Sequence, residues 1–536
     1  MATIQRWCPR DTMTTQENVL MARLAKHRKL FGFLREHRAA LFDEAFLDSL
    51  SAMYRQSGAG KEPVCPGLMA MAMLLQGYDK VSDKEAVERT VIDLRWQMVL
   101  DCLGAKESAF SQGAFQEFRQ RMIRNDLDQR LLERTVELAR TTGAFDFRKL
   151  PPTLRVAMDS MPLEGAGRVE DTINLLAHAG RKVVQCAAKI LDWTAERVCH
   201  EAGAPLLAGS SVKASLDRNW GNPNDRNEAV NQLIDELTSL DEWLKQRLPD
   251  EVEAPPLSEH LETVQQLIAQ DLEPDPNGSG SLQIREGVAV DRRVSIEDKE
   301  MRHGRKSKSK KFNGYKRHIA VDLDTMLIVA CAVAPANRPE EESAAELARD
   351  MKFLDRKIGS LNIDRGFINA PLVDEVANDN GEINCRPWVP RNGKFFSKAL
   401  FQINIRKRTI TCPEGQTAPV KFGYTVEFDA EKCGRCSSRS KCTDASAEQG
   451  RTVAIAKNEA RQKRLQKLVK TPAGRAKLRE RVSVEHSLAH AGRRQGKRAR
   501  YWGVRRNLWD WRRAAAITNL ETIDRQLDLG AARWAA

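Results

Sequence analysis

The sequence predicts an α/β fold built on a mixed β-sheet, and three observations predict it. A strand-like segment at residues 154–160 holds Asp159, and a second at residues 360–364 ends in Asp364. A helix-prone run that begins near residue 471 carries Glu485, four residues after an arginine. Strands separated by helical segments are typical of sheets covered by helices. We interpret the rest of the chain as the scaffold that brings these three carboxylates together.

Residues 1–150 are predicted to form a helical domain. Pro66 stands at the first turn of an apolar helix, and Ser82 and Glu85 match a capping box at the start of another. Short helices of this kind that carry several arginines could enter a DNA groove, so we expect this domain to bind DNA; a plain helical bundle is the alternative.

Residues 151–390 and 466–536 are predicted to form the sheet-containing domain. The predicted elements are a strand at 154–160, a hairpin at 314–323 and 326–333, a helix at 339–357, a strand at 360–364, a helix at 371–378, a strand at 383–389 and the late helix that holds Glu485. This order is that of an RNase H-like domain, a mixed sheet with its first strand in the centre and helices on both faces.

Two insertions interrupt this predicted domain. Residues 165–300 follow the first strand and read as helices, and residues 391–465 precede the last helix as a small β-rich segment with four cysteines. A Cys-x2-Cys pair with two further cysteines is compatible with tetrahedral zinc coordination, while free thiols in a small β insertion are the alternative. The four residues are Cys412, Cys433, Cys436 and Cys442.

The composition is that of a globular protein with a polyanionic partner. Hydrophobic residues make up 41% of the 536 and charged residues 30%, and the formal net charge is +13. Basic residues crowd residues 302–317 and 493–513, on either side of the predicted acids. No apolar run is long enough to span a bilayer and no signal pattern opens the chain, so we expect a cytoplasmic protein with reduced cysteines and no membrane partner.

Several motifs resemble the DDE transposases of bacterial insertion sequences, closest to the IS1182 group within the IS4-like assemblage. They are Met301-Arg-His-Gly-Arg-Lys-Ser, Phe312-Asn-Gly-Tyr-Lys-Arg-His, Ala334-Pro-Ala-Asn-Arg-Pro-Glu, Asp364-Arg-Gly-Phe, Arg481-x3-Glu485 and Gly496-Lys-Arg-Ala-Arg-Tyr-Trp-Gly. The resemblance extends over nearly the whole chain. In the IS4-like pattern a tyrosine precedes the arginine by three residues and a lysine follows the glutamate by seven, where this chain has Leu478 and Gly492. Arg493 or Arg494 is the expected substitute for that lysine.

The resemblance and the residues together imply a metal-dependent enzyme that cuts and joins DNA. Magnesium prefers hard carboxylate oxygens, and two ions can stabilise the attacking and leaving oxygens of phosphodiester transfer. We expect Asp159 to bridge two Mg²⁺ ions, Asp364 to hold one and Glu485 the other, with Mn²⁺ as a substitute metal. The rival acids Asp322, Glu341 and Glu342 have local explanations in a turn or a helix dipole.

The expected DNA contacts come from the basic segments near the acids. Phosphate contacts position DNA without reading its sequence. Tyr501, with its neighbour Trp502, is expected either to stack on an unpaired base or to pack inside the protein. The proposed phosphate contacts are Lys316, Arg317, His318, Arg481, Arg493 and Arg494.

Three functions remain open from the sequence. The first is a transposase that acts on terminal inverted repeats and target DNA as a homodimer, at the bacterial nucleoid. The second is an RNase H-fold nuclease or resolvase that cuts without strand transfer. The third is a catalytically inactive, transposase-derived regulator that only binds DNA. The complete acid trio favours an enzyme, and the insertions and basic flanks favour the transposase.

Overall fold

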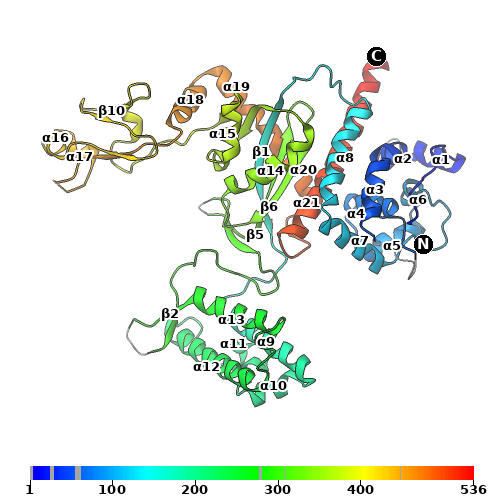
Figure 1. The fold of residues 1–536 in the computed structure, drawn as a ribbon, viewed down its shortest axis with the longest axis horizontal. Helices are drawn as coiled ribbons and strands as arrows, with labels where there is room; N and C mark the ends of the chain where they lie inside the picture. The colour runs from blue at the N-terminus through cyan, green and yellow to red at the C-terminus, as the bar shows by residue number, and fades with distance from the viewer. Residues whose placement is uncertain are drawn as a thin grey trace.

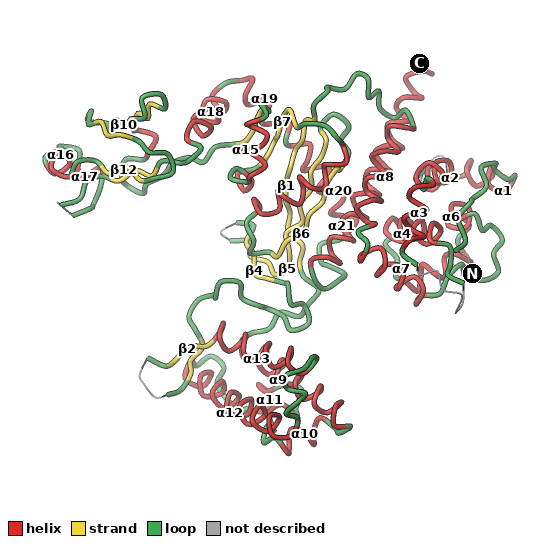
Figure 2. Tube along the Cα trace, in the orientation of Figure 1, coloured by secondary structure: helices red, strands yellow, loops and turns green. Residues whose placement is uncertain are grey.

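A six-stranded mixed sheet lies at the centre of the molecule (Figures 1 and 2). The computed structural model describes residues 4–24, 29–54, 62–276, 280–307, 309–446 and 448–535, with side chains described through residue 529. The strands of the sheet are β1 (Leu154–Glu164), β4 (Arg302–Arg305), β5 (Lys311–Asp322), β6 (Ile328–Pro335), β7 (Ile358–Ile363) and β8 (Glu382–Cys385).

The first strand is central, as predicted. The sheet order is β4-β5-β1-β7-β8, and β6 pairs with the part of β5 that β4 leaves free. β1 runs antiparallel to β5 and parallel to β7, and β7 runs parallel to β8. The prediction of a mixed α/β sheet is therefore confirmed. Two strands differ in length from the prediction, because β1 continues to Glu164 and β8 ends at Cys385.

Helices cover the sheet and connect it to the N-terminal part of the chain. In Figure 1, α8 and α21 run between the sheet and the N-terminal helices. The predicted helix at 339–357 is divided into two 3-10 turns, η2 (Glu340–Ser343) and η3 (Met351–Leu354), on either side of α14. The helices around the sheet are α14 (Ala344–Asp350), α15 (Pro371–Asn378), α20 (Val482–Gln495) and α21 (Val504–Ala535), and the 3-10 turn η4 (Arg365–Phe367) follows β7.

The N-terminal helices share one continuous apolar core with the sheet. Ser82 caps α5 by accepting a hydrogen bond from the Glu85 amide at 3.1 Å, so the predicted helix start is confirmed. The Glu85 carboxylate bonds to Arg89 and not back to the cap, so only half of the capping box forms. These helices are α1 (Thr15–Leu24), α2 (Leu30–Leu41), α3 (Glu44–Ala52), α4 (Pro66–Asp79), α5 (Asp83–Ile92), α6 (Leu94–Leu100), α7 (Gln112–Arg124) and α8 (Leu127–Thr141).

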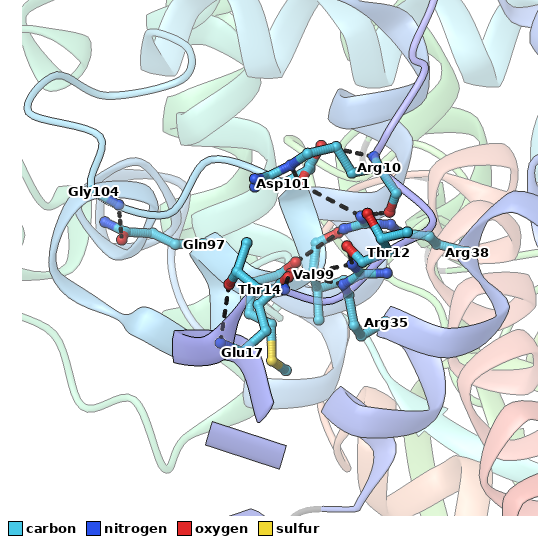
Figure 3. A network of polar contacts seen from close by, with 11 residues as sticks. Arg10, Thr12, Thr14, Glu17, Arg35, Arg38, Gln97, Val99, Asp101 and Gly104 are labelled. Atoms are coloured by element: carbon cyan, nitrogen blue, oxygen red, sulfur yellow. Dashed lines mark hydrogen bonds and ion pairs between the residues drawn. The ribbon is translucent and has the colours of Figure 1, made fainter. Parts of the chain in front are cut away.

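Buried arginines fasten the first residues of the chain to this helical part (Figure 3). Arg35 donates to the Glu17 carboxylate at 2.7 Å, and both side chains are almost completely buried. Arg38 donates to the backbone carbonyls of Met98, Val99 and Arg10. A guanidinium with several donors can thus bond backbone carbonyls at the end of α6 and in the irregular N-terminal segment at the same time.

A helical module with its own core follows β1. Its buried apolar side chains form a cluster separate from that of the sheet. It lies below the sheet in Figure 1. Its elements are α9 (Thr172–Leu191), α10 (Ala195–Glu201), η1 (Pro205–Leu207), α11 (Val212–Ser215), α12 (Pro223–Arg247), α13 (Leu257–Asp271) and the small hairpin β2 (Leu272–Pro274) and β3 (Leu282–Ile284).

A small β module with a third core precedes α20. It forms one end of the molecule in Figure 1, and α18 and α19 lead from it back to the sheet. Within the described ranges, no helix is both long enough and apolar enough to cross a membrane. The elements here are η5 (Lys398–Leu400), β9 (Gln402–Asn404), β10 (Thr409–Thr411), β11 (Thr417–Pro419), β12 (Thr425–Glu427), α16 (Ala430–Gly434), α17 (Arg439–Cys442), β13 (Thr452–Ala454), α18 (Glu459–Lys470) and α19 (Pro472–Glu480).

Candidate active site

Asp159 and Asp364 lie at matching positions of neighbouring parallel strands. Ala157 of β1 pairs with Asn362 of β7. Asp159 lies two residues after Ala157, and Asp364 lies two residues after Asn362. Neighbouring strands are about 4.8 Å apart, so this register places the two carboxylates side by side. β7 ends at Ile363 while β1 continues, which opens the sheet beside Asp159.

Glu485 comes from the first turn of α20, which packs against β1. The helix approaches the sheet closely at Gly492, where a Cβ atom would lie 2.8 Å from Met161 Sδ. A larger residue at this position, such as the lysine of the IS4-like pattern, would have to displace the Met161 side chain. Gly492 therefore permits the close packing that brings the start of α20 to the aspartates.

Arg481 connects two of the three acids. Its Nη1 atom lies 3.0 Å from Asp159 Oδ2, and its Nη2 donates to Glu485 Oε1 at 3.0 Å. The Nη1 contact is a charge contact without hydrogen-bond alignment. The guanidinium thus provides positive charge at the place where the two carboxylates face each other.

One pocket of about 420 Å³ holds all three acids. Besides Arg481, three basic side chains line it together with the acids: Lys316, Arg305 and Lys306. Burial raises the pKa of the Asp159 carboxyl, Arg481 and the Ser160 amide lower it, and Asp364 and Glu485 raise it again. The three acids are therefore close enough to repel one another, a situation that a bound cation relieves.

Glu340 is a fourth acid in this pocket and was missed from the sequence. Its Oε1 atom accepts a 2.5 Å hydrogen bond from the Ser160 hydroxyl, next to Asp159. Its other oxygen, Oε2, lies against Gly366, where an added Cβ atom would be only 2.0 Å from that oxygen. Glu340 therefore packs between β1 and the turn after Asp364. The run of three glutamates after Pro339 gave no reason to distinguish the first from the others.

The rival acids lie outside the pocket. Asp322 accepts hydrogen bonds from Thr325 Oγ1 at 2.8 Å and from the Asp324 amide at 3.2 Å, as a turn-forming residue does. Glu341 and Glu342 lie in the 3-10 turn that follows Pro339 and do not line the pocket.

Two predicted DNA contacts, Arg317 and His318, are core side chains. Arg317 is 1% exposed and donates to Gln495 Oε1 and the Gly496 carbonyl, beneath Trp511. His318 is 0% exposed, packs edge-on against Phe367, and burial lowers its pKa to about 3. Both predictions are corrected, since neither side chain reaches the surface. Of this basic triplet, only Lys316 lines the pocket.

The other predicted contacts are at least partly exposed. Arg494 pairs with Glu521 of α21 and lies over the Tyr78 ring, with only 10% of its side chain exposed. Tyr501 packs edge-on against Trp509 at 5.7 Å and under the Arg119 guanidinium, and its pKa is raised by burial. Both side chains make contacts within the protein but stay partly exposed, so their DNA contacts stay predictions. Arg493 is exposed and Arg481 lies in the pocket.

The four cysteines of the small β module line a single cavity of about 620 Å³. All four are free thiols, and burial raises the pKa of Cys442, which the other three raise further. Soft thiolates in one cavity fit a zinc ion in their chemistry. The residues involved are Cys412, Cys433, Cys436 and Cys442.

Neither the acids nor the cysteines form a finished ligand shell. In the part of the chain that the structure describes, no three His, Cys, Asp or Glu side chains are placed closely enough to hold a metal ion. At the acids, the Arg481 guanidinium pairs with Asp159 and Glu485. The carboxylate donors nevertheless fit a hard divalent cation in their chemistry.

The comparisons agree with this geometry. A family model described as "Transposase DDE domain" matches residues 283–520, and one described as "Transposase domain (DUF772)" matches residues 20–121. Neither a curated protein nor a solved structure is detectably similar to the chain. DDE domains have an RNase H-like fold and generally use divalent metal ions on DNA, in keeping with the sheet order and the acids. The two domain models, which occur together in the IS1182 family, identify the chain as a DDE transposase of an insertion sequence.

Proposed function

We propose that this transposase cleaves the ends of its element and joins them to target DNA with Asp159, Asp364 and Glu485 as catalytic carboxylates. The observation that carries the proposal is their shared pocket at the carboxyl end of β7, with Arg481 among them. Terminal inverted repeats and target DNA are the proposed substrates, and a homodimer that holds two ends is the proposed working form.

The chemistry is displacement at phosphorus in two steps. In the first, a water oxygen attacks the phosphodiester and loses a proton, the P–O3′ bond breaks, and the departing O3′ takes up a proton to become a hydroxyl. In the second, the freed 3′-hydroxyl attacks a target phosphodiester, so one P–O bond forms as another breaks. Two Mg²⁺ ions, or Mn²⁺ in their place, stabilise the attacking and leaving oxygens when bound by the three carboxylates.

Arg481 has two roles in this proposal. Without metal it neutralises Asp159 and Glu485, which limits the repulsion among buried carboxylates. With DNA bound, its guanidinium suits a bidentate phosphate contact at the same place. Lys316 in the pocket and the exposed Arg493 are further proposed phosphate contacts.

The proposed organisation assigns a part to each section of the chain. Residues 1–150 bind the element ends, and residues 151–390 with 466–536 carry the reaction. Residues 165–300 and 391–465 are insertions into that catalytic domain, and each has an apolar cluster of its own in support. The DNA substrate makes the bacterial cytoplasm, at the nucleoid, the proposed place of action.

A joining assay tests the function. The full chain is incubated with Mg²⁺, labelled element ends and a plasmid target, and we expect ends covalently joined to the plasmid. Nicked ends without joined products would instead indicate a nuclease. A mobility shift without any cleavage would indicate a DNA-binding regulator.

Glu340→Gln is expected to lower cleavage by roughly 10- to 100-fold, the usual effect of losing a partner that orients metal ligands. The change keeps the size of the side chain and removes the charge beside Ser160 and Asp159. We expect the Mg²⁺ concentration for half-maximal cleavage to rise as well. Glu342→Gln, two residues away and exposed, is the matched control. Equal Mg²⁺ curves for the two variants would assign Glu340 a purely structural role.

We further propose that the four cysteines hold one structural zinc ion, which their common cavity supports. Freshly purified, reduced protein is expected to contain about one zinc per chain by metal analysis. Cys433→Ser is expected to lose it, while Cys8→Ser, at an exposed cysteine far along the chain, keeps it. Reduced protein without zinc would leave the free-thiol alternative.

A further inference from the structure

The helical module contains a basic pocket that the proposed reaction does not use. The pocket has a volume of about 380 Å³ and lies between α9 and α13, with the segment before β4 as its third wall. α9 contributes Lys182 and Lys189, α13 contributes His260, and the segment contributes Arg293 and Lys299. No carboxylate lines it within the described residues.

Arg293 makes the base of this pocket unusually positive. It is 4% exposed, and its guanidinium donates only to neutral oxygens: Ser295 O at 2.9 Å, Thr263 Oγ1 at 3.2 Å and Ile296 O at 2.6 Å. Burial and Arg302 lower its pKa. Glu297 and Asp298 raise it by less, and both are bonded to other partners, Glu297 to His178 and Asp298 to the Gly503 amide. A buried guanidinium without a carboxylate partner is costly unless an anion compensates it.

The charges around His260 point to the same positive potential. Burial lowers its pKa, and Lys299, Lys182 and Arg293 all lower it further, against Glu259 alone. Glu259 pairs with Lys299 at 3.2 Å, on the exposed side of α13. Lys182 and Lys189 have no recorded ion pair among the described side chains. Among the lining side chains, positive charge therefore exceeds negative charge on the α9 wall and on the wall formed by the segment before β4.

We propose that this pocket binds a phosphate group of the DNA backbone, so that the helical module is a second DNA-holding surface. Lys189 and Gln185 are exposed at its rim, which makes it accessible to a polymer. The inference rests on the DNA-directed function and extends it to a module outside the catalytic sheet.

The wall of the pocket is also fastened to the catalytic domain. Asp298, one residue before Lys299, accepts hydrogen bonds from Tyr315 Oη of β5 and, at 3.2 Å, from the Gly503 amide. A phosphate held by Lys299 and Arg293 is thereby held at a fixed place relative to the sheet. Contacts of this kind position a duplex without reading its sequence.

The test compares two lysine variants of the full chain. Lys182→Gln/Lys189→Gln removes two charges from the pocket, and Lys245→Gln removes one from α12, where it pairs with Asp241 at 2.6 Å. Binding to a fluorescent linear duplex is measured over a salt series without added divalent cation, so that cleavage does not interfere. All three sites are on the surface, and thermal unfolding verifies that each variant folds.

The pocket variant is expected to bind the duplex roughly tenfold more weakly than wild type. The slope of log binding constant against log salt concentration should be smaller in magnitude by about 1, as the loss of one phosphate contact predicts. The Lys245 control should match wild type. Equal slopes for wild type and the pocket variant would overturn the inference and leave the transposase function intact. Failure of wild type itself to bind any duplex would overturn both.

A second arm separates DNA phosphate from a free phosphate anion. Inorganic phosphate is titrated into wild type and the pocket variant by calorimetry. Submillimolar binding that only wild type shows, together with unchanged DNA affinity of the variant, would assign the pocket to a free phosphate-bearing molecule and overturn the DNA assignment. Weaker DNA binding by the variant than by wild type would support the assignment of the pocket to DNA phosphate.

Discussion

Asp159→Asn, Asp364→Asn and Glu485→Gln are each expected to reduce DNA cleavage by on the order of 10³-fold or more, while binding of the element ends persists. Each change removes one anionic oxygen from the shared pocket and keeps the size of the side chain. Binding should persist because the proposed phosphate contacts are cations that remain in place. Single-turnover cleavage of a labelled end and a mobility shift with the same DNA measure the two quantities.

The appropriate control is Glu341→Gln, since Glu341 follows Glu340 in sequence but does not line the pocket. It should cleave like wild type. The folded state should tolerate the loss of charge at Asp159, because burial already raises the pKa of that carboxyl and disfavours its ionised form. Undiminished cleavage by any one of the three variants would remove that residue from the catalytic set.

The sequence was sufficient for the sheet because local patterns and chain order both indicate it. Short continuous apolar runs mark β6 and the second half of β5, and the order of strands and helices allows few arrangements. The parallel pairing of β1 with β7 then brings Asp159 beside Asp364, although 204 residues separate them in the sequence. A shared register of this kind follows from topology, so the acid pair could be predicted.

The surroundings of the acids could not be predicted so well. Glu340 reaches Ser160 from a turn 180 residues away, and no local pattern distinguishes it from the two glutamates that follow. For the basic triplet at residues 316–318, too many residues were predicted to contact DNA, since only Lys316 lines the pocket. Arg317 is turned inward by hydrogen bonds to Gln495 and the Gly496 carbonyl, which lie almost 180 residues further along the chain. No local pattern in the sequence indicates such distant partners.

Arg512→Met is expected to cost about 3–5 kcal/mol of unfolding free energy, the usual result of removing one partner from a buried ionic group. Arg512 of α21 donates to Asp128 of α8 at 3.1 Å and to both oxygens of Asp350 of α14 at 2.9 and 3.1 Å. The three side chains are at most 2% exposed. The substitution leaves two carboxylates buried without this guanidinium, at the place where the N-terminal helices meet the sheet domain.

The loss of unfolding free energy in Arg512→Met should depend on pH in a defined direction. Burial raises the pKa of the Asp350 carboxyl and Arg512 lowers it, so without Arg512 that pKa rises further above its unfolded value. An acid with a raised folded pKa destabilises the protein at high pH and ceases to do so as pH falls through that value. The difference in unfolding free energy between Arg512→Met and wild type, measured by urea unfolding, should therefore shrink as the pH is lowered from 7 towards 5.

Two further variants make the result interpretable. Arg506→Met, on the exposed side of the same helix, should change the unfolding free energy by no more than about 0.5 kcal/mol. Arg512→Lys keeps the charge but loses the forked contact with both aspartates, so its loss should lie between those of the other two. If Arg512→Met unfolds like Arg506→Met at both pH values, the ionic group does not hold α8 and α14 to α21, and the shared apolar core alone joins the N-terminal helices to the sheet.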